Sequence, residues 1–208
     1  MRFIFSICCI LFLGSAFTPQ ANNYPFREWK QEELEQANTA KNVSYMTSEE
    51  KQVFFYLNLA RINPKLFAET YYQQYLDSSG IKNSYTTSLL ATLKKSKFSH
   101  ALLPDSLLWS AAAGHAAATG KQGTTGHAGH EKRYKLVKKR FPYWAECCSY
   151  GAAKSFGIAI QLLIDEGVPD HSHRESLLDP KYTHAGASIQ THNKYAWTCV
   201  INLGGATE

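Results

Sequence analysis

The sequence of 208 residues predicts an α+β domain in which helices come first and strands come last. Two observations favour this class. Apolar residues recur with helical spacing through the earlier part of the chain, and they alternate with polar residues near the C-terminus. A third observation is that no internal repeat or long linker divides the chain. We therefore expect a single domain of ordinary size.

Composition limits the class of protein further. The chain has 22 Lys+Arg against 17 Asp+Glu, a net charge of +5, and it is 44% hydrophobic. A chain of this length buries enough apolar surface to fold without disulfides, so its five cysteines do not form a scaffold. The mild positive charge argues against a surface that wraps a polyanion, and no nucleic-acid partner is expected.

The N-terminus has the three parts of a secretory signal peptide. Arg2 precedes an apolar run from Phe3 to Leu13, and the small residues of Gly14-Ser15-Ala16 follow. The run is too short to be a transmembrane segment. We expect a signal peptide over 1–16, a polar leader over 17–46 that is loose or forms a short helix, and the domain over 47–208. The expected location is secreted, extracellular or periplasmic.

Two helices are predicted at the start of the domain. Thr47 and Glu50 have the spacing of a capping box, and an apolar-periodic run follows them. Pro64 interrupts that run and can open the second helix, which Asp77-Ser78-Ser79-Gly80 ends. Residues 80–99 are read as a loop or a weak helix.

The middle of the chain contains two further predicted helices. Pro104-Asp105-Ser106 starts one that continues through alanine-rich sequence to Gly120, with a face of small residues that allows close packing. Residues 120–151 are read as a loop. A last helix is expected over 152–166.

The C-terminal segments change to a period of two. Residues 185–190 and 195–201 alternate small or apolar residues with polar ones, and Thr191-His-Asn-Lys separates them. This pattern predicts an antiparallel hairpin that closes the domain.

Histidines form one candidate for chemistry. Six of the eight lie in one stretch: His115, His127, His130, His171, His173 and His184. Imidazole is the commonest metal ligand and titrates near neutral pH, yet no His-Glu-x-x-His motif occurs. The residues alone leave two interpretations open. One is a metal or acid/base site that uses one histidine from the pair His127 and His130 and one from the pair His171 and His173. The other is that these are surface or capping histidines.

Cysteines and lysines supply two weaker signals. No nucleophile motif surrounds Cys147-Cys148, so we expect one of these two residues to form a disulfide with Cys199 and the other to be a buried thiol. The basic run from Lys132 to Arg140 is read as a solvated face, with attraction to an anionic surface as its alternative.

Several motifs taken together resemble the CAP superfamily, also called the SCP or PR-1 domain, in its bacterial form. They are Asn58-x-x-Arg61, the alanine-rich Leu107 to His115, Gly126-His127, Glu146 with Gly151, Leu163 to Pro169, and His173-Arg174 with the segment to Gly186. The resemblance covers residues 48–205 in order. It departs from the family pattern at Ala145, Cys147, Ser172 and Ser176, which replace glycine or asparagine.

The resemblance implies an α-β-α sandwich with a small antiparallel sheet between helices, and a cavity with two histidines and two acids. By position these are His127, Glu146, His173 and either Asp165 or Glu166, with Asp165 preferred. His115 is interpreted as a core histidine or a residue that supports the cavity.

Three functions follow as hypotheses. The leading one is a secreted, non-enzymatic protein that binds Zn²⁺ or another divalent cation at His127 and His173, and that binds a lipid-like ligand or an extracellular macromolecule. The second is a metal- or His/Glu-dependent hydrolase of peptides or cell-wall material, with Glu146 as base and His173 as its partner. In the third, the polar cluster only stabilises the fold, and loops 80–99 and 130–143 carry the function.

Overall fold

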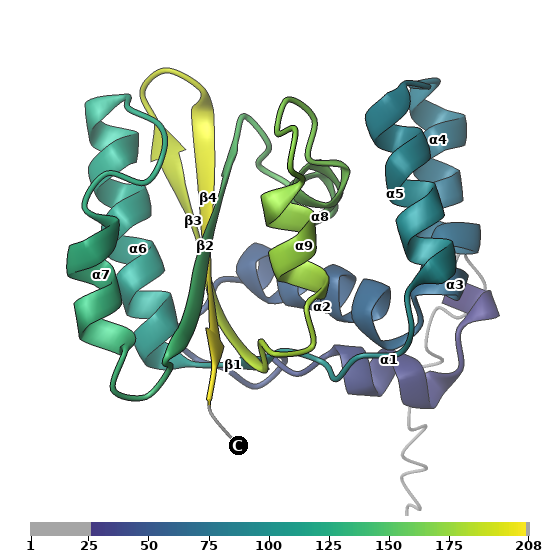
Figure 1. The fold of residues 1–208 in the computed structure, drawn as a ribbon, viewed down its shortest axis with the longest axis horizontal. Helices are drawn as coiled ribbons and strands as arrows, with labels where there is room; N and C mark the ends of the chain where they lie inside the picture. The colour runs from purple at the N-terminus through teal and green to yellow at the C-terminus, as the bar shows by residue number, and fades with distance from the viewer. Residues whose placement is uncertain (1–25, 207–208) are drawn as a thin grey trace, which may run out of the picture.

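A computed structural model describes residues 26–206, and the predicted signal peptide lies outside them. Figure 1 shows the arrangement of the elements. The helices are η1 (Phe26–Glu28), α1 (Gln31–Ala37), α2 (Ser48–Ile62), α3 (Pro64–Phe67), the π-helical turn η2 (Ala68–Tyr72), α4 (Gln73–Ser79), α5 (Ser84–Lys95), α6 (Ser106–Gln122), α7 (His130–Val137), α8 (Ser155–Ile164) and α9 (Ser172–Leu178). The strands are β1 (Leu103–Pro104), β2 (Tyr143–Tyr150), β3 (His184–His192) and β4 (Ala196–Gly205).

The four strands form one sheet in the order β1-β3-β4-β2. The short β1 runs parallel to β3, and the other neighbours are antiparallel. Helix α6 packs against β3 and β4 on one face, with α7 beside it, and α2, α8 and α9 lie on the other side of the sheet (Figure 1). The α+β class and the C-terminal hairpin are confirmed.

The predicted capping box at the start of α2 is present, and it also anchors the sheet. Thr47 Oγ1 accepts from the Glu50 amide, and Glu50 Oε2 accepts from the Thr47 amide at 2.8 Å. The other oxygen of this buried carboxylate accepts from the Ile189 amide of β3, also at 2.8 Å. One side chain therefore fixes both the first turn of α2 and the position of β3.

Residues 26–46, which the sequence left as a polar leader, pack on the domain from Trp29 onward. The Trp29 ring is buried and its indole N–H donates to Thr70 Oγ1 at 3.1 Å. The fully buried Asn58 donates to the Ala37 carbonyl at 3.0 Å and accepts from the Leu102 amide at 2.7 Å. The side-chain amide of Asn58 thus joins the N-terminal segment to the chain that enters β1.

Close packing of α6 on the sheet requires glycine at Gly186. A β-carbon there would overlap the backbone of Leu108 and Trp109 on α6. A β-carbon on Gly120 would likewise overlap the backbone of Thr191. The face of small residues predicted for this helix therefore brings two backbones into direct contact.

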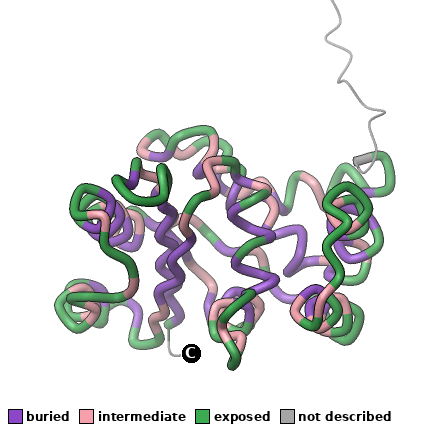
Figure 2. The backbone as a smooth tube through the Cα atoms, turned by 90° about the horizontal axis from the view of Figure 1, so that it is seen from above, coloured by how far each residue is buried: buried purple, intermediate pink, exposed green. Residues whose placement is uncertain are grey.

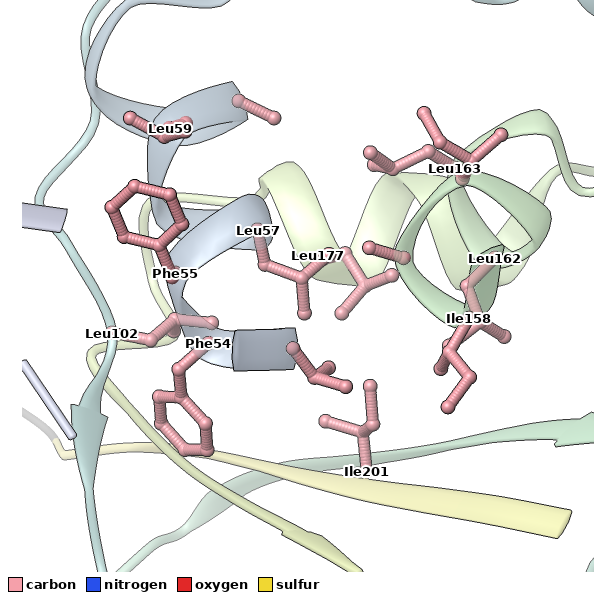
Figure 3. Packing of buried hydrophobic residues seen from close by; sticks show 14 of the residues in the cluster. Phe54, Phe55, Leu57, Leu59, Leu102, Ile158, Leu162, Leu163, Leu177 and Ile201 are labelled. Atoms are coloured by element: carbon pink, nitrogen blue, oxygen red, sulfur yellow. The ribbon is translucent and has the colours of Figure 1, made fainter. Parts of the chain in front are cut away.

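Most of the core lies between the sheet and α2, α8 and α9, as the purple tube in Figure 2 indicates. Figure 3 shows Leu57, Ile158, Leu163 and Leu177 packed above Ile201 of β4. A smaller cluster on the opposite face includes Ala112, Ala116, Cys148 and Val200. Between residues 26 and 206 there is no helix with the length and apolar character needed to cross a membrane.

The structure decides one open alternative and corrects one prediction. Residues 84–95 form a regular helix, capped by Asn83, which accepts from the Thr86 amide at 2.9 Å. The stretch 120–151, predicted as a loop, contains α7 and the edge strand β2. Strand β2 was missed because Glu146 and Ser149, both buried, interrupt its apolar pattern, and their partners come from distant parts of the chain.

The predicted disulfide to Cys199 is wrong, because Cys147, Cys148 and Cys199 are all free thiols. Strand register gives the reason. Cys199 lies opposite Ser149, so Cys148 projects from the other face of the sheet. Cys147 shares the face of Cys199 but is its diagonal neighbour, at a typical separation of about 7–8 Å, beyond disulfide geometry.

Candidate functional site

The candidate site is built around Glu146, whose side chain is fully buried on β2. Its two oxygens receive a double hydrogen bond from Arg133 of α7, from Nε to Oε2 and from Nη2 to Oε1, each at 2.6 Å. Oε1 also lies 2.9 Å from His127 Nδ1 and 3.6 Å from His115 Nε2. Three basic side chains from α6, α7 and the loop between them therefore surround one carboxylate.

Arg133 belongs to the basic run that was predicted to be solvated, and for this residue the prediction is wrong. Its side chain is only 12% exposed, because helix α7 turns it inward onto Glu146. Arg133 Nη1 also donates to the Ala128 carbonyl at 2.7 Å, which ties α7 to the His127 loop. A planar guanidinium matches a carboxylate in this way with both oxygens engaged.

The second half of the site is a His173–Asp165 pair. Asp165 ends α8 in a left-handed conformation (φ 59°) and is buried. Its Oδ1 lies 2.7 Å from His173 Nδ1, while Oδ2 accepts from the amides of His173 and Arg174 at 2.9 and 3.2 Å. The carboxylate therefore caps the start of α9 and orients the imidazole that α9 carries.

The His127–Glu146 and His173–Asp165 pairs lie next to each other, because the ring centroids of the two histidines are 6.3 Å apart. In each ring Nδ1 faces a buried carboxylate, which leaves Nε2 for another partner. The His130 ring lies 6.5 Å from that of His127 and 4.4 Å from Trp144. We call the region between His127 and His173 the histidine cleft.

The remaining candidates lie elsewhere or play other parts. Glu166 is exposed and accepts from the Asn83 side chain at 3.0 Å, so Asp165 is the acid that faces His173. His171 packs against Tyr85, and His184 against Phe141. His115 is buried on the alanine face of α6, where its Nε2 lies 2.9 Å from the Gly126 carbonyl oxygen.

Cys148 is a site residue that sequence reasoning missed. Its sulfur lies 3.8 Å from His127 Nδ1, on the same strand face as Glu146. Burial alone raises the pKa of this thiol, but hydrogen bonds with His115 and His127 outweigh burial and lower it. Alternation along β2 would have indicated the shared face of residues 146 and 148, had the strand been recognised.

The same contacts shift the other groups of the cluster. Hydrogen bonds with Cys148 and then Glu146 raise the pKa of His127 to about 10. Burial disfavours the charged form of Glu146, but hydrogen bonds from His127 and Arg133 prevail and hold its pKa at about 2. For His115, burial is outweighed by hydrogen bonds with Cys148 and Gly126, and the pKa is raised. His127 and Glu146 are therefore both charged at neutral pH.

These shifts predict a window of maximal stability. The contribution of Glu146 is complete above its ordinary pKa of 4.5 and is lost as the pH falls toward 2. The contribution of His127 is complete below its ordinary 6.5 and is lost as the pH rises through about 10. We expect the stabilisation that this pair provides to be greatest between pH 4.5 and 6.5. Urea unfolding across the pH range, compared with Glu146→Gln, measures it; a difference between the two proteins that does not change with pH would contradict the pairing.

No protein-family model and no curated protein matches this chain. Two solved bacterial structures are similar to it, each with a TM-score of 0.43. One is an outer surface protein from Borrelia burgdorferi, with 18% identity over 59% of this chain and 90% of that protein. The other is an extracellular protein containing an SCP domain from Bacillus anthracis, with 15% identity over 59% of this chain and 39% of that protein.

Proposed function

We propose that this chain is an exported protein of the CAP type, with the α-β-α sandwich of that superfamily, whose histidine cleft binds a divalent cation such as Zn²⁺. In this proposal the protein acts by binding a lipid-like ligand or an extracellular macromolecule rather than by catalysis. The order of the sequence motifs supports the class. The observation that carries the metal proposal is the pair of imidazoles, His127 and His173, each oriented by a buried carboxylate.

The donor set fits a zinc-type ion. Zn²⁺ binds imidazole nitrogen at about 2.0–2.1 Å, and metal-bound histidines usually donate their other nitrogen to a carboxylate. Around a tetrahedral ion, bonds of this length would hold the two ring centres roughly 5.2 Å apart. The observed 6.3 Å therefore requires the two rings to approach each other by about 1 Å when the ion binds. Glu146 and Asp165 would then orient the ligands and balance the charge of the ion.

Metal binding should depend on His127 and His173 and should strengthen with pH. Isothermal titration with Zn²⁺ at pH 8 is expected to show binding to the wild type that His127→Ala and His173→Ala each weaken by at least about 100-fold, the upper end of what loss of a supporting residue costs. Because the proton on His127 competes with the ion, the affinity should rise as the pH is raised from 6 to 8.

His184→Ala is the matched control, since this histidine lies on β3 against Phe141, outside the histidine cleft. It should leave the affinity unchanged. Wild-type protein that takes up no Zn²⁺ at pH 8 or above, while circular dichroism shows it folded, would refute the metal proposal.

The hydrolase hypothesis has weaker support from the geometry. A general base needs an accessible oxygen and a pKa near the working pH. Glu146 is fully buried, both of its oxygens accept from Arg133, and its pKa is held at about 2. A screen of peptide and peptidoglycan substrates tests the alternative directly, and turnover that Glu146→Gln abolishes would favour it over a binding role.

A further inference from the structure

A second group of metal-binding side chains lies on the α6 side of β2. His115 of α6 and Glu146 and Cys148 of β2 each offer one donor atom, and these atoms all lie within 4.8 Å of one another. Each of the three residues is at most 8% exposed. Side chains alternate along a strand, so Glu146 and Cys148 project together toward His115. His173 is not part of this group.

We propose that His115, Glu146 and Cys148 form a buried metal site for Zn²⁺ or another ion that accepts a thiolate. It lies beside the histidine cleft, borders His127 and does not include His173. The proposal does not depend on metal binding at His173. Imidazole, carboxylate and thiolate are all zinc ligands, and the thiolate selects against Mg²⁺ and Ca²⁺.

The spacing of the donors suits a tetrahedral ion. Bonds of about 2.0–2.3 Å place neighbouring donors roughly 3.3–3.8 Å apart. His115 Nε2 and Glu146 Oε1 are separated by 3.6 Å. His127 Nδ1, at 3.8 Å from Cys148 Sγ and 2.9 Å from Glu146 Oε1, stands next to the remaining ligand position. To bind the ion, His115 Nε2 would give up its contact with the Gly126 carbonyl oxygen, which lies 2.9 Å away, and His127 Nδ1 would give up Glu146 Oε1.

The positive charge of Arg133 is the main electrostatic obstacle to a cation at this site. The groups around the guanidinium reduce its effect. When Oε1 turns to the ion, Arg133 Nε can keep its bond to Oε2, and Nη1 keeps the Ala128 carbonyl. Nη2 already lies 3.4 Å from the His127 carbonyl oxygen, which can accept it in place of Oε1. The thiolate and the carboxylate together balance a divalent charge, and this offsets the repulsion from the guanidinium.

The site also has a route of entry. A groove of about 480 Å³ runs between α6 and the segment that carries α7, and both His115 and Arg133 line it. Above Gly114 this groove is open, since a β-carbon there would meet nothing within 4 Å. Of the three proposed ligands, His115 lines this groove, so the groove is the side from which we expect an ion to approach.

Cobalt spectroscopy on the reduced chain tests the proposal, because a thiolate bound to Co²⁺ gives a near-ultraviolet charge-transfer band that imidazole and carboxylate do not give. We expect the wild type and His173→Ala to show this band. Cys148→Ser should lose it entirely, and His115→Gln should weaken Co²⁺ uptake at this site by at least about tenfold. Cys147→Ser is the matched control, because its thiol is equally buried but faces the other side of the sheet.

The outcomes separate the two metal proposals. Co²⁺ uptake without the band would overturn the thiolate site and leave the histidine cleft standing. A band that disappears in His173→Ala as well as in Cys148→Ser would also overturn it as a separate site. A band that survives in Cys147→Ser and His173→Ala but not in Cys148→Ser supports it, even if Zn²⁺ does not bind in the cleft. Circular dichroism of each variant establishes that the fold is retained.

Discussion

Replacement of Arg61 by methionine is expected to lower the free energy of unfolding by about 4 kcal/mol. Arg61 is 1% exposed, and its guanidinium donates five hydrogen bonds within the domain. Four of the acceptors are backbone carbonyls, those of His100, Leu177, Asp179 and Tyr182, and the fifth is Ser99 Oγ. Methionine fills a similar volume but removes the donors of all five hydrogen bonds, three of which are buried. Burial lowers the pKa of Arg61 to about 10, so the side chain is still charged at neutral pH.

Urea unfolding at pH 7 measures the loss. Arg61→Lys keeps the charge but not the planar fork, and it should recover only part of the stability. Lys65→Met, at an exposed position on the neighbouring α3, should change the free energy by less than about 0.5 kcal/mol. A loss below about 1 kcal/mol for Arg61→Met would show that the five hydrogen bonds are not the main tie between α2 and the chain that enters β1 and β3.

Replacement of Glu146 by glutamine should cost about 3 kcal/mol at pH 6, where both partners are charged. The amide keeps the shape of the side chain but removes the charge that Arg133 and His127 face, and it cannot accept both Arg133 hydrogen bonds in the same manner. The shift of the Glu146 pKa from 4.5 to about 2 corresponds to a similar energy at about 1.4 kcal/mol per unit.

Thermal and urea unfolding of Glu146→Gln measure this cost, with Glu131→Gln as the control because that carboxylate is exposed on α7. A double-mutant cycle with Arg133→Met should give a coupling energy of at least about 1.5 kcal/mol. Additive effects of the two substitutions would mean that the ion pair contributes little, and Glu146 would then be only a buried acid without a structural partner.

The variants also separate a structural from a functional role for the cluster. Arg61→Met removes stability without touching the histidine cleft, so the fraction that stays folded should bind Zn²⁺ as the wild type does. Glu146→Gln removes the partner of His127 Nδ1 and should weaken both stability and Zn²⁺ binding. If the polar cluster served only the fold, the folded fraction of His127→Ala and His173→Ala would bind any partner with unchanged affinity.

Local patterns were sufficient for much of the fold. The Thr47–Glu50 capping box, Pro64 and the Asp105 cap each mark a helix start through contacts within a few residues, and all three are present. The C-terminal hairpin likewise follows from alternation on both sides of a short connection. By contrast, β2 depends on pairing with β4, and α9 begins where Asp165 caps it from the end of α8. These contacts are not visible in a local window.

The sequence by itself determined the α+β class, the helix starts, the closing hairpin and the residues that the family resemblance carried to the histidine cleft. Only the tertiary structure decided which acid faces His173, that Arg133 turns from the basic run onto Glu146, and that Cys148 joins His115 rather than bonding to Cys199. The physical reason is that capping and periodicity act over a few residues. The partner of a buried charge or thiol is set instead by strand register and by the packing of α6 and α7 on the sheet.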